Sequence, residues 1–264
     1  MRHVSPAPCA AVSHHALGHA ASRLHALVHR SRRRHRIRGQ RLWPYGITVE
    51  TIADIARCPG WRETGRVDVT DLDADPLHQI STWLDAARAA GQPIPEAMTI
   101  ATATSDAMPS ARLVVLRGLR RGLVFFTDCQ SDKGAELAAN PRAAAVLHWL
   151  VPAHRQVRVA GPVERVGADE ADEYWSTRTP AVRLAAAASH QSRVVASRAV
   201  LEIQVQDNLR RHPGRVDVRR PQRWGGFRVL PSRVEFWQES PDGLHDRIRY
   251  RREGGGWIIE RLSP

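Results

Sequence analysis

Lys133 and its neighbours have the residue types and the spacing of an anion-binding site. Residues 132–140 contain helix-forming residues and stop before Pro141, which predicts a helix with Ser131 at its N-cap and Lys133 in its first turn. Free backbone N–H groups at a helix start, together with a cation, favour a phosphate. Lys133 is also the single lysine among 39 basic residues. A solvated surface lysine is the alternative that these residues alone leave open.

Two apolar runs lie just before this helix and would position it. Residues 113–116 and 123–126 are rich in β-branched and aromatic side chains, and a turn over residues 118–122 separates them. That composition predicts a β-hairpin, followed by a polar loop over residues 127–131. The stretch from Arg112 to Lys133 is therefore interpreted as an anion-binding edge.

The net charge of +12 is concentrated at one end of the 264-residue chain. Residues 1–49 contain nine arginines, seven of the thirteen histidines and no acidic residue, which leaves 30 of the 39 basic residues against all 27 acidic ones. We interpret residues 1–49 as a disordered basic tail, residues 50–74 as a linker of uncertain order and residues 75–264 as the folded domain. A transit peptide and an over-long translation start are alternatives for the tail.

Several protein classes find no support in the sequence. Cys9, Cys58 and Cys129 are widely spaced, which fits a reducing cytoplasm and indicates neither a disulfide scaffold nor a cysteine metal site. No run reaches the length of a membrane span. The absence of a GxGxxG or P-loop motif weighs against a Rossmann or nucleotide-hydrolysing enzyme. We therefore expect a cytoplasmic protein with no metal, no membrane partner and no nucleic-acid partner.

A helix and a series of short strands would position these residues. Asp75 and Pro76 begin a helix whose apolar face ends near Gly91. Residues 168–177 and 197–212 are further predicted helices, and the other predicted strands span residues 98–104, 143–150, 156–166, 224–230, 234–238, 245–251 and 257–262. Gly161-Pro162 suggests a bulge in the third of these strands. Because hairpin follows hairpin, we expect an antiparallel sheet that forms a small closed or partly open barrel with appended helices.

From Asp75 to the C-terminus the sequence resembles the pyridoxamine 5'-phosphate oxidase family of FMN enzymes. The motifs that carry the resemblance are, in order, AMTIATA, RLVVLRG, VFFT, SDKG, ELAANPRA, RQVRVAG, SHQS, WGGFRV, VEFWQ, LHDRIRY and ERLSP. Each motif is weak alone, but their order and spacing make the combination specific. The resemblance implies a mainly β fold with appended helices (α+β), an antiparallel FMN-binding split β-barrel, that acts as a homodimer with FMN at the subunit interface.

The resemblance also implies roles for individual residues. The residues that would bind FMN are Arg112, Leu113, Val114, Val115, Leu116, Arg117, Phe126, Thr127, Lys133, Gln156, Gln191, Ser192, Trp224 and Arg247. The residues that would bind the substrate are Arg117, Tyr174, Arg178 and His245, of which His245 and Arg117 would also be catalytic. Arginine suits a phosphate because its fork gives charge-assisted, often bidentate hydrogen bonds. Trp237 is instead expected to be a core aromatic residue.

Four positions depart from the family pattern. Arg117 stands in place of a lysine, Asp132 in place of an arginine that often precedes the lysine, and Val182 in place of a serine that helps to hold the substrate phosphate. Gly243 stands in place of an arginine that lies over the substrate ring, and it supplies no side chain. These departures concern the substrate more than the flavin, although Asp132 also places a carboxylate beside the expected phosphate.

The leading hypothesis is an FMN-dependent oxidase that converts pyridoxamine or pyridoxine 5'-phosphate to pyridoxal 5'-phosphate with O2 as acceptor and H2O2 as product. An oxidase of the same family with a different, phenazine-like substrate is the first alternative, which Gly243 and Val182 favour. A non-catalytic flavin-binding protein is the second. A nucleic-acid binder has only the basic tail in its favour.

Overall fold

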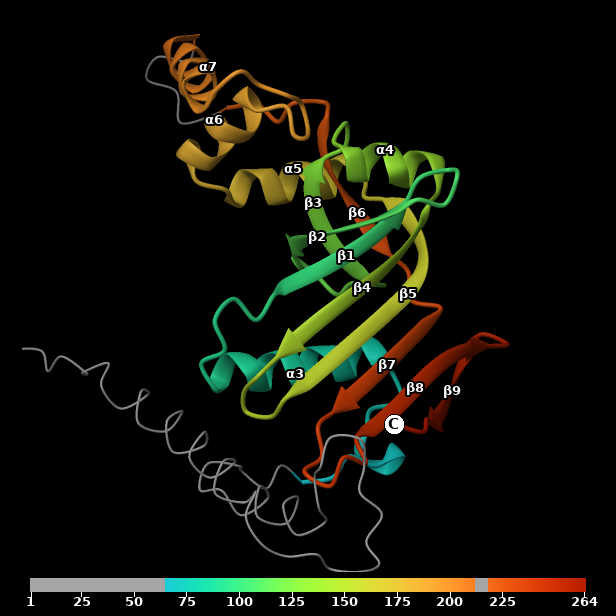
Figure 1. Cartoon of the computed structure of the whole chain (residues 1–264). Helices are drawn as coiled ribbons and strands as arrows, with labels where there is room; N and C mark the ends of the chain where they lie inside the picture. Colours follow the sequence, from blue (N-terminus) through green and yellow to red (C-terminus); the bar gives the residue numbers. More distant parts are fainter. Residues whose placement is uncertain (1–64, 212–217) are drawn as a thin grey trace, which may run out of the picture. The chain divides into compact units, whose positions relative to one another are not determined.

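The computed structural model describes residues 65–211 and 218–264 (Figure 1). The expectations for the tail, residues 1–49, and for the linker up to residue 64 lie outside these residues. In the described ranges no helix is long and apolar enough to cross a membrane.

Nine strands and several helices make up the described part of the chain, with the labels of Figure 1. The helices are η1 (Val69–Asp71), α3 (Pro76–Ala89), α4 (Asp132–Ala139), α5 (Ala168–Thr177), α6 (Pro180–Ala188) and α7 (Arg198–Arg211). The strands are β1 (Ala97–Ala103), β2 (Pro109–Val115), β3 (Leu123–Asp128), β4 (Arg142–Trp149), β5 (Arg155–Arg165), β6 (Trp224–Val229), β7 (Arg233–Gln238), β8 (Asp246–Glu253) and β9 (Gly256–Arg261). All pairings between these strands are antiparallel, which confirms the predicted fold class.

Strand β5 belongs to two sheets at once. Its residues 155–160 pair with β7, whereas its residues 163–165 pair with β6. Gly161 lies where the partner changes, and a Cβ atom there would lie 1.8 Å from the carbonyl oxygen of Leu230, so only glycine allows this approach. Along β4, strand β5 pairs from Arg155 to Pro162 without an inserted residue. On its other edge Ala160 pairs with Arg233 and Val163 with Val229, so the extra residue of the predicted bulge lies in the β6–β7 connection and not in β5. The glycine serves the branching of the sheet instead.

The predicted hairpin between residues 113–116 and 123–126 is also wrong. Strand β2 pairs along its whole length with β1, and β3 pairs along its whole length with β6. The second run contacts only the turn residue Gly118, through an isolated bridge to Val124. Each run therefore forms its ladder along one edge with another strand: β2 with β1, which precedes it in the sequence, and β3 with β6, which the local sequence does not reveal.

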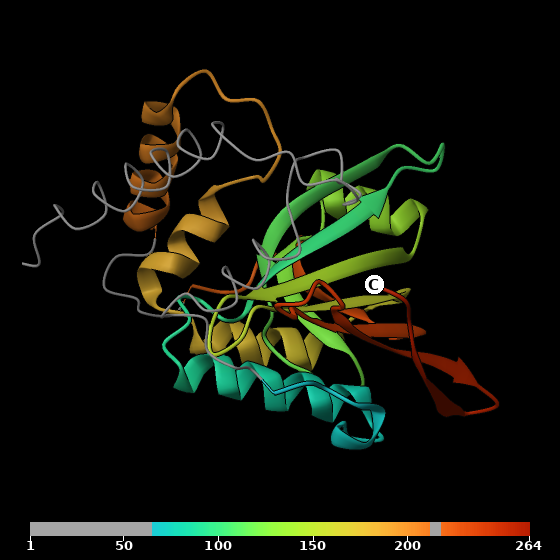
Figure 2. The same cartoon turned by 60° about the horizontal axis from the view of Figure 1, so that its bottom comes forward.

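Helix α3 closes the core on one side of the C-terminal sheet, by which we mean the neighbouring strands β5, β7, β8 and β9. The side chain of Asp75 accepts a hydrogen bond from the backbone N–H of Leu77 at 2.9 Å, which confirms the predicted N-cap. Trp83 is buried and meets the ring of Phe236 edge-on, with 5.1 Å between ring centroids. Figures 1 and 2 show α6 and α7 away from α3 in both views. Helix α6 has no counterpart among the sequence predictions.

Candidate functional site

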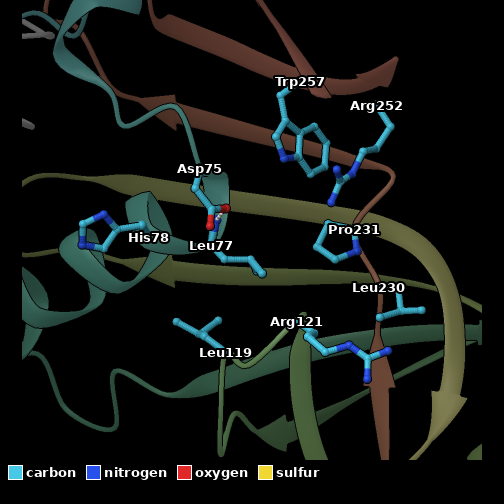
Figure 3. A pocket seen from close by; sticks show the side chains of 9 residues that line it. All are labelled: Asp75, Leu77, His78, Leu119, Arg121, Leu230, Pro231, Arg252 and Trp257. Carbon is cyan, nitrogen blue, oxygen red and sulfur yellow. Dashed lines mark hydrogen bonds between the residues drawn. The ribbon is translucent and has the colours of Figure 1, made fainter. Parts of the chain in front are cut away.

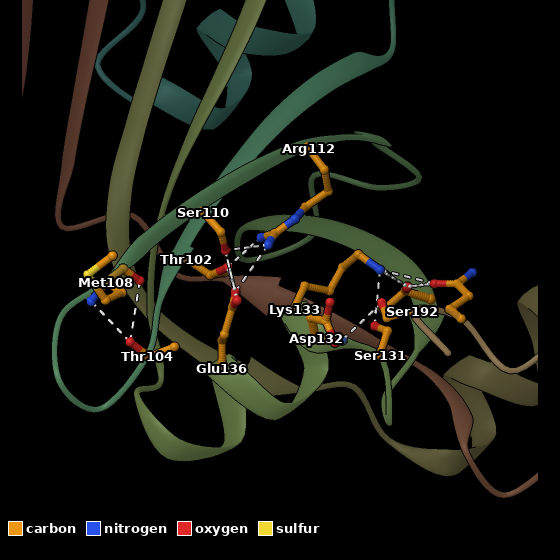
Figure 4. A network of polar contacts seen from close by, with 12 residues as sticks. Thr102, Thr104, Met108, Ser110, Arg112, Ser131, Asp132, Lys133, Glu136 and Ser192 are labelled. Carbon is orange, nitrogen blue, oxygen red and sulfur yellow. Dashed lines mark hydrogen bonds and ion pairs between the residues drawn. The ribbon is translucent and has the colours of Figure 1, made fainter. Parts of the chain in front are cut away.

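Lys133 is held by three oxygen atoms from three segments (Figure 4). Its Nζ donates to Thr127 Oγ1 at 3.1 Å, to Ser131 Oγ at 3.0 Å and to Gln191 Oε1 at 3.0 Å. Ser131 occupies the predicted N-cap position of α4, but its hydroxyl donates to the Asp128 carbonyl at 2.6 Å instead of capping the helix. The lysine is therefore fixed by its surroundings, and the side chain of Ser131 leaves the helix start uncapped.

The charge of Lys133 is only partly balanced by these contacts. Burial lowers the pKa of Lys133, and the positive charge of Arg112 lowers it further. Asp128, Asp132 and Glu136 act in the opposite direction but do not outweigh burial. A ligand anion beside Lys133 and Arg112 would relieve this repulsion, so this corner of the molecule fits a phosphate.

Arg112 is held by the half-buried carboxylate of Glu136, which the sequence interpretation missed. Its guanidinium pairs with Glu136 Oε2 at 3.1 Å and also donates to the hydroxyls of Thr102 and Ser110. Both hydroxyls bond Glu136 in turn. Burial would raise the pKa of Glu136, but hydrogen bonds from these three residues outweigh it and lower the pKa. The only sequence signal was its position three residues after Lys133 on the same helix.

Three stacked rings form a wall next to this corner. Phe126 stacks on Tyr174 at 4.1 Å and on Trp224 at 5.6 Å. The guanidinium of Arg178 lies over the ring of Trp224 at 4.8 Å, and that of Arg117 lies over Tyr174 at 5.5 Å. The sequence-predicted residues Phe126, Tyr174, Trp224, Arg117 and Arg178 are thus brought together.

Arg178 has an unmet donor in this wall. Its Nη1 is buried and has no hydrogen-bond partner among the described residues. Burial lowers the pKa of Arg178, and the neighbouring charge of Arg117 also lowers it, while Tyr174 raises it. An unpaired buried N–H costs about 1–3 kcal/mol, and an anionic ligand would recover that cost.

A second group, on other strands, joins the predicted residues Gln156 and Arg247 to His148 and Trp237, which were not predicted as site residues. His148, Gln156, Trp237 and Arg247 stand opposite one another in a row across β4, β5, β7 and β8, and therefore share one face of the sheet. The His245 ring lies 5.0 Å from that of Trp237, and its Nδ1 accepts a hydrogen bond from the backbone N–H of Ser240 at 3.1 Å. Trp237 is half-buried on this face, so its assignment to the core was wrong.

The remaining predicted residues lie at the margins of the first group. On β2, Leu113 is 72% exposed, whereas Leu116, just after the strand, is buried. Ser192 accepts a hydrogen bond from the backbone N–H of Asp132 at 3.2 Å, which ties the loop after α6 to the start of α4. Val114 and Val115 are half-buried on β2.

The structure shows where two of the departures from the family pattern, Gly243 and Val182, lie. Gly243 has φ +76°, and its N–H donates to the Ser240 carbonyl at 3.1 Å, so the glycine fits a tight turn before β8. Val182 lies exposed on α6, where it makes no polar contact. The fold therefore accommodates Gly243 and Val182 at these two positions.

Comparisons with known proteins agree with this architecture. Residues 84–209 match the family model described as pyridoxamine 5'-phosphate oxidase, and residues 224–264 match the pyridoxine 5'-phosphate oxidase C-terminal dimerisation region. The pyridoxine/pyridoxamine 5'-phosphate oxidase of Cupriavidus necator is 50% identical over 202 residues, which cover 76% of this chain and 94% of that protein. The enzyme of the same name from Salinibacter ruber is 45% identical over 82% of this chain and 100% of that protein.

Among solved structures, PhzG from Burkholderia lata in complex with tetrahydrophenazine-1-carboxylic acid has a TM-score of 0.70 at 33% identity and covers 76% of this chain and 100% of that one. A pyridoxamine 5'-phosphate oxidase-related, FMN-binding protein from Nostoc punctiforme shares the fold, with a TM-score of 0.56 at 20% identity, and covers 70% of this chain and 95% of that one.

Proposed function

This chain belongs to the pyridoxamine 5'-phosphate oxidase family of oxidoreductases, and from that premise we propose that it binds FMN and oxidises pyridoxamine or pyridoxine 5'-phosphate to pyridoxal 5'-phosphate. The substrate would lose a hydride from the reacting carbon and a proton from its amine or hydroxyl, and O2 would take up the two electrons and two protons to give H2O2. The imine from pyridoxamine 5'-phosphate would then react with water to give the aldehyde and ammonia. FMN, when bound, supplies the acceptor for the hydride and the route of its electrons to O2.

The corner around Lys133 fits the phosphate of FMN. Lys133 and Arg112 supply two cations, of which the arginine is held in place by Glu136. Thr127, Gln191 and Ser192 add polar groups that a ligand could share. Phosphate-binding sites combine donors of this kind with a helix start, as α4 does here.

Arg178 is the observation that carries the substrate assignment. An anion would satisfy its buried, unpaired Nη1, and the indole ring of Trp224 lies beside its guanidinium at 4.8 Å. We assign Arg178 and Tyr174 to the substrate phosphate, with Arg117 at the same wall. Correct placement of the phosphate would hold the reacting carbon still for oxidation.

His245, Gln156 and Arg247 would complete the site from a second subunit. They lie on the C-terminal sheet, and the match to a C-terminal dimerisation region supports a homodimer with FMN at its interface. Because His245 Nδ1 accepts the Ser240 N–H, the neutral ring carries its proton on Nε2. That N–H could donate to the amine or hydroxyl of the substrate.

The phosphate assignment is tested by Arg178→Lys, which keeps the charge but loses the fork. We expect the KM for pyridoxamine 5'-phosphate to rise about tenfold or more, since a hydrogen bond to a charged group is worth about 1.5–3 kcal/mol. The KM for unphosphorylated pyridoxamine should barely change. Arg142→Lys, an exposed position on β4, is the control. If the KM values for both substrates rise equally, Arg178 does not bind the substrate phosphate.

An altered substrate is the second candidate, favoured by the absence of a side chain at Gly243 and by the 33% identity to a protein solved with a tetrahydrophenazine carboxylic acid. A panel of phosphorylated pyridines, other amines and reduced phenazine carboxylates, assayed for H2O2 release, separates the two. A yellow protein that releases peroxide with none of them would be a flavin-binding protein without oxidase activity.

A further inference from the structure

A second cavity lies on the face of the C-terminal sheet opposite to Arg247. Along β8, residues 246, 248 and 250 are buried in the core, so Arg252 continues that core-facing series, whereas Arg247 points to the other face. The cavity has a volume of about 890 Å³, within the usual range of small-molecule sites. It is therefore separate from the candidate site.

The floor of this cavity is apolar and comes from four segments (Figure 3). Helix α3, the turn between β2 and β3, the β6–β7 connection and β9 contribute Leu77, Leu119, Leu230, Pro231 and Trp257. Leu77, Leu119 and Trp257 pack against the core on one side and leave their other side uncovered. Such a floor suits a flat or ring-shaped apolar group.

Two arginine side chains, Arg121 and Arg252, line the cavity (Figure 3). Arg252 lies over the ring of Trp257 at 4.2 Å and otherwise bonds only the Gly255 carbonyl at 3.2 Å among the described residues. Arg121 has the left-handed conformation with φ +61°, and its ion pair with Glu164 is loose at 3.4 Å. A strained backbone that presents a charged side chain to a cavity is often associated with binding.

The acidic and imidazole groups at the rim are already engaged. Asp75 caps α3 through the N–H of Leu77, and His78 pairs with Asp73 at 2.7 Å. Two arginines against one aspartate leave the lining of the cavity with a positive balance, which comes from Arg252 and from Arg121 with its loose ion pair.

We infer that this cavity is a ligand site for a small aromatic anion, an aryl carboxylate, sulfonate or phosphate whose ring lies on the apolar floor and whose charge lies between Arg121 and Arg252. The ring contacts supply apolar burial, and the guanidiniums supply charge-assisted hydrogen bonds. The inference does not depend on the proposed oxidase activity.

The test compares two fluorescent probes on the full chain with FMN added. 8-Anilinonaphthalene-1-sulfonate carries a charge, and N-phenyl-1-naphthylamine has the same rings without it. We expect one sulfonate per chain, bound at least tenfold more weakly by the Arg121→Ala/Arg252→Ala double variant, while the neutral probe loses less than threefold. Arg120→Ala, the exposed neighbour outside the cavity, should bind like the wild type.

Three outcomes would overturn the inference: no binding of the sulfonate, an unchanged affinity in the double variant, or equal losses for the two probes. Unaltered flavin absorbance shows that the variants are folded, because neither arginine belongs to the FMN site. If the chain binds the sulfonate as expected but takes up no FMN, the oxidase proposal is contradicted and the inference about this cavity is not.

Discussion

The group around Lys133 and the group around His245 are built differently. The first is closed within one chain, since β2, β3, α4 and the loop at Gln191 all contribute hydrogen bonds to it. The second is an open row on one face of the C-terminal sheet, next to the turn that contains Gly243. We infer that the phosphate end of the proposed FMN site is fixed by this chain alone, whereas the proposed His245 end would be completed by a partner subunit and is free to differ.

The largest expected effect concerns the closed group. Lys133→Ala removes one of two cations beside the expected FMN phosphate, so FMN should bind about ten- to a hundredfold more weakly, as expected for a charge-assisted hydrogen bond of about 1.5–3 kcal/mol. Arg247→Ala should weaken FMN less, because Arg247 also pairs with Glu235 at 2.8 Å. Quenching of FMN fluorescence measures both. If Arg247→Ala weakens FMN binding more than Lys133→Ala does, the group around Lys133 is not the one that mainly holds FMN.

Glu136→Gln leaves the charge of Arg112 unchanged but removes the carboxylate that holds its guanidinium in place. The lowered pKa of Glu136 means that its ionised form stabilises the fold above the unfolded pKa of about 4.3, and that this contribution is lost as pH falls through the lower folded pKa. The variant should therefore lose stability at neutral pH and show a flatter dependence between pH 3 and 5, measured by urea unfolding. Its FMN affinity should fall severalfold because Arg112 loses its anchor. Unchanged FMN affinity would show that the clamp serves stability only.

Gly243→Arg tests the open group. The new side chain would restore the arginine of the family pattern, which should lower the KM for pyridoxamine 5'-phosphate severalfold. A non-glycine residue at φ +76° costs about 1–2 kcal/mol, so the variant should also unfold at a lower urea concentration. Gly243→Ala carries the same backbone cost without the guanidinium and is the matched control. If both variants behave alike in turnover, the missing arginine does not limit this enzyme.

The smallest effect is expected at His148, at the edge of the same row. Its Nε2 lies 2.8 Å from that of His154, and burial together with the charge of His154 lowers the pKa of His148. Stability from this pair is therefore present above the unfolded pKa of about 6.5 and is lost as pH falls through the lower folded value. His148→Gln should flatten the decline in stability between pH 7.5 and 5.5. If the free energy of unfolding falls with pH equally in the variant and the wild type, the titration of His148 does not contribute to this decline.

The sequence predicted where helices and strands lie better than it predicted which strands pair with each other. Helix α5 and the cap of α3 follow from local residues and were confirmed. The pairing of β3 with β6 joins residues about a hundred positions apart, and no local propensity reports it. For the same reason Glu136 was missed, because its partners Thr102 and Ser110 lie on other strands. The site residues named from family resemblance stay predictions, although the structure brings many of them together.

Strand β5 also limits how this fold can change over evolution. Because it pairs with β4 on one edge and with β7 and then β6 on the other, one inserted or deleted residue would turn every side chain beyond it to the opposite face in two sheets at once. Gln156 and the branching residue Gly161 are thereby locked to a fixed separation. The turn at 240–243 lies outside these ladders, so it can change in length as well as in residue type without a shift of register in either sheet.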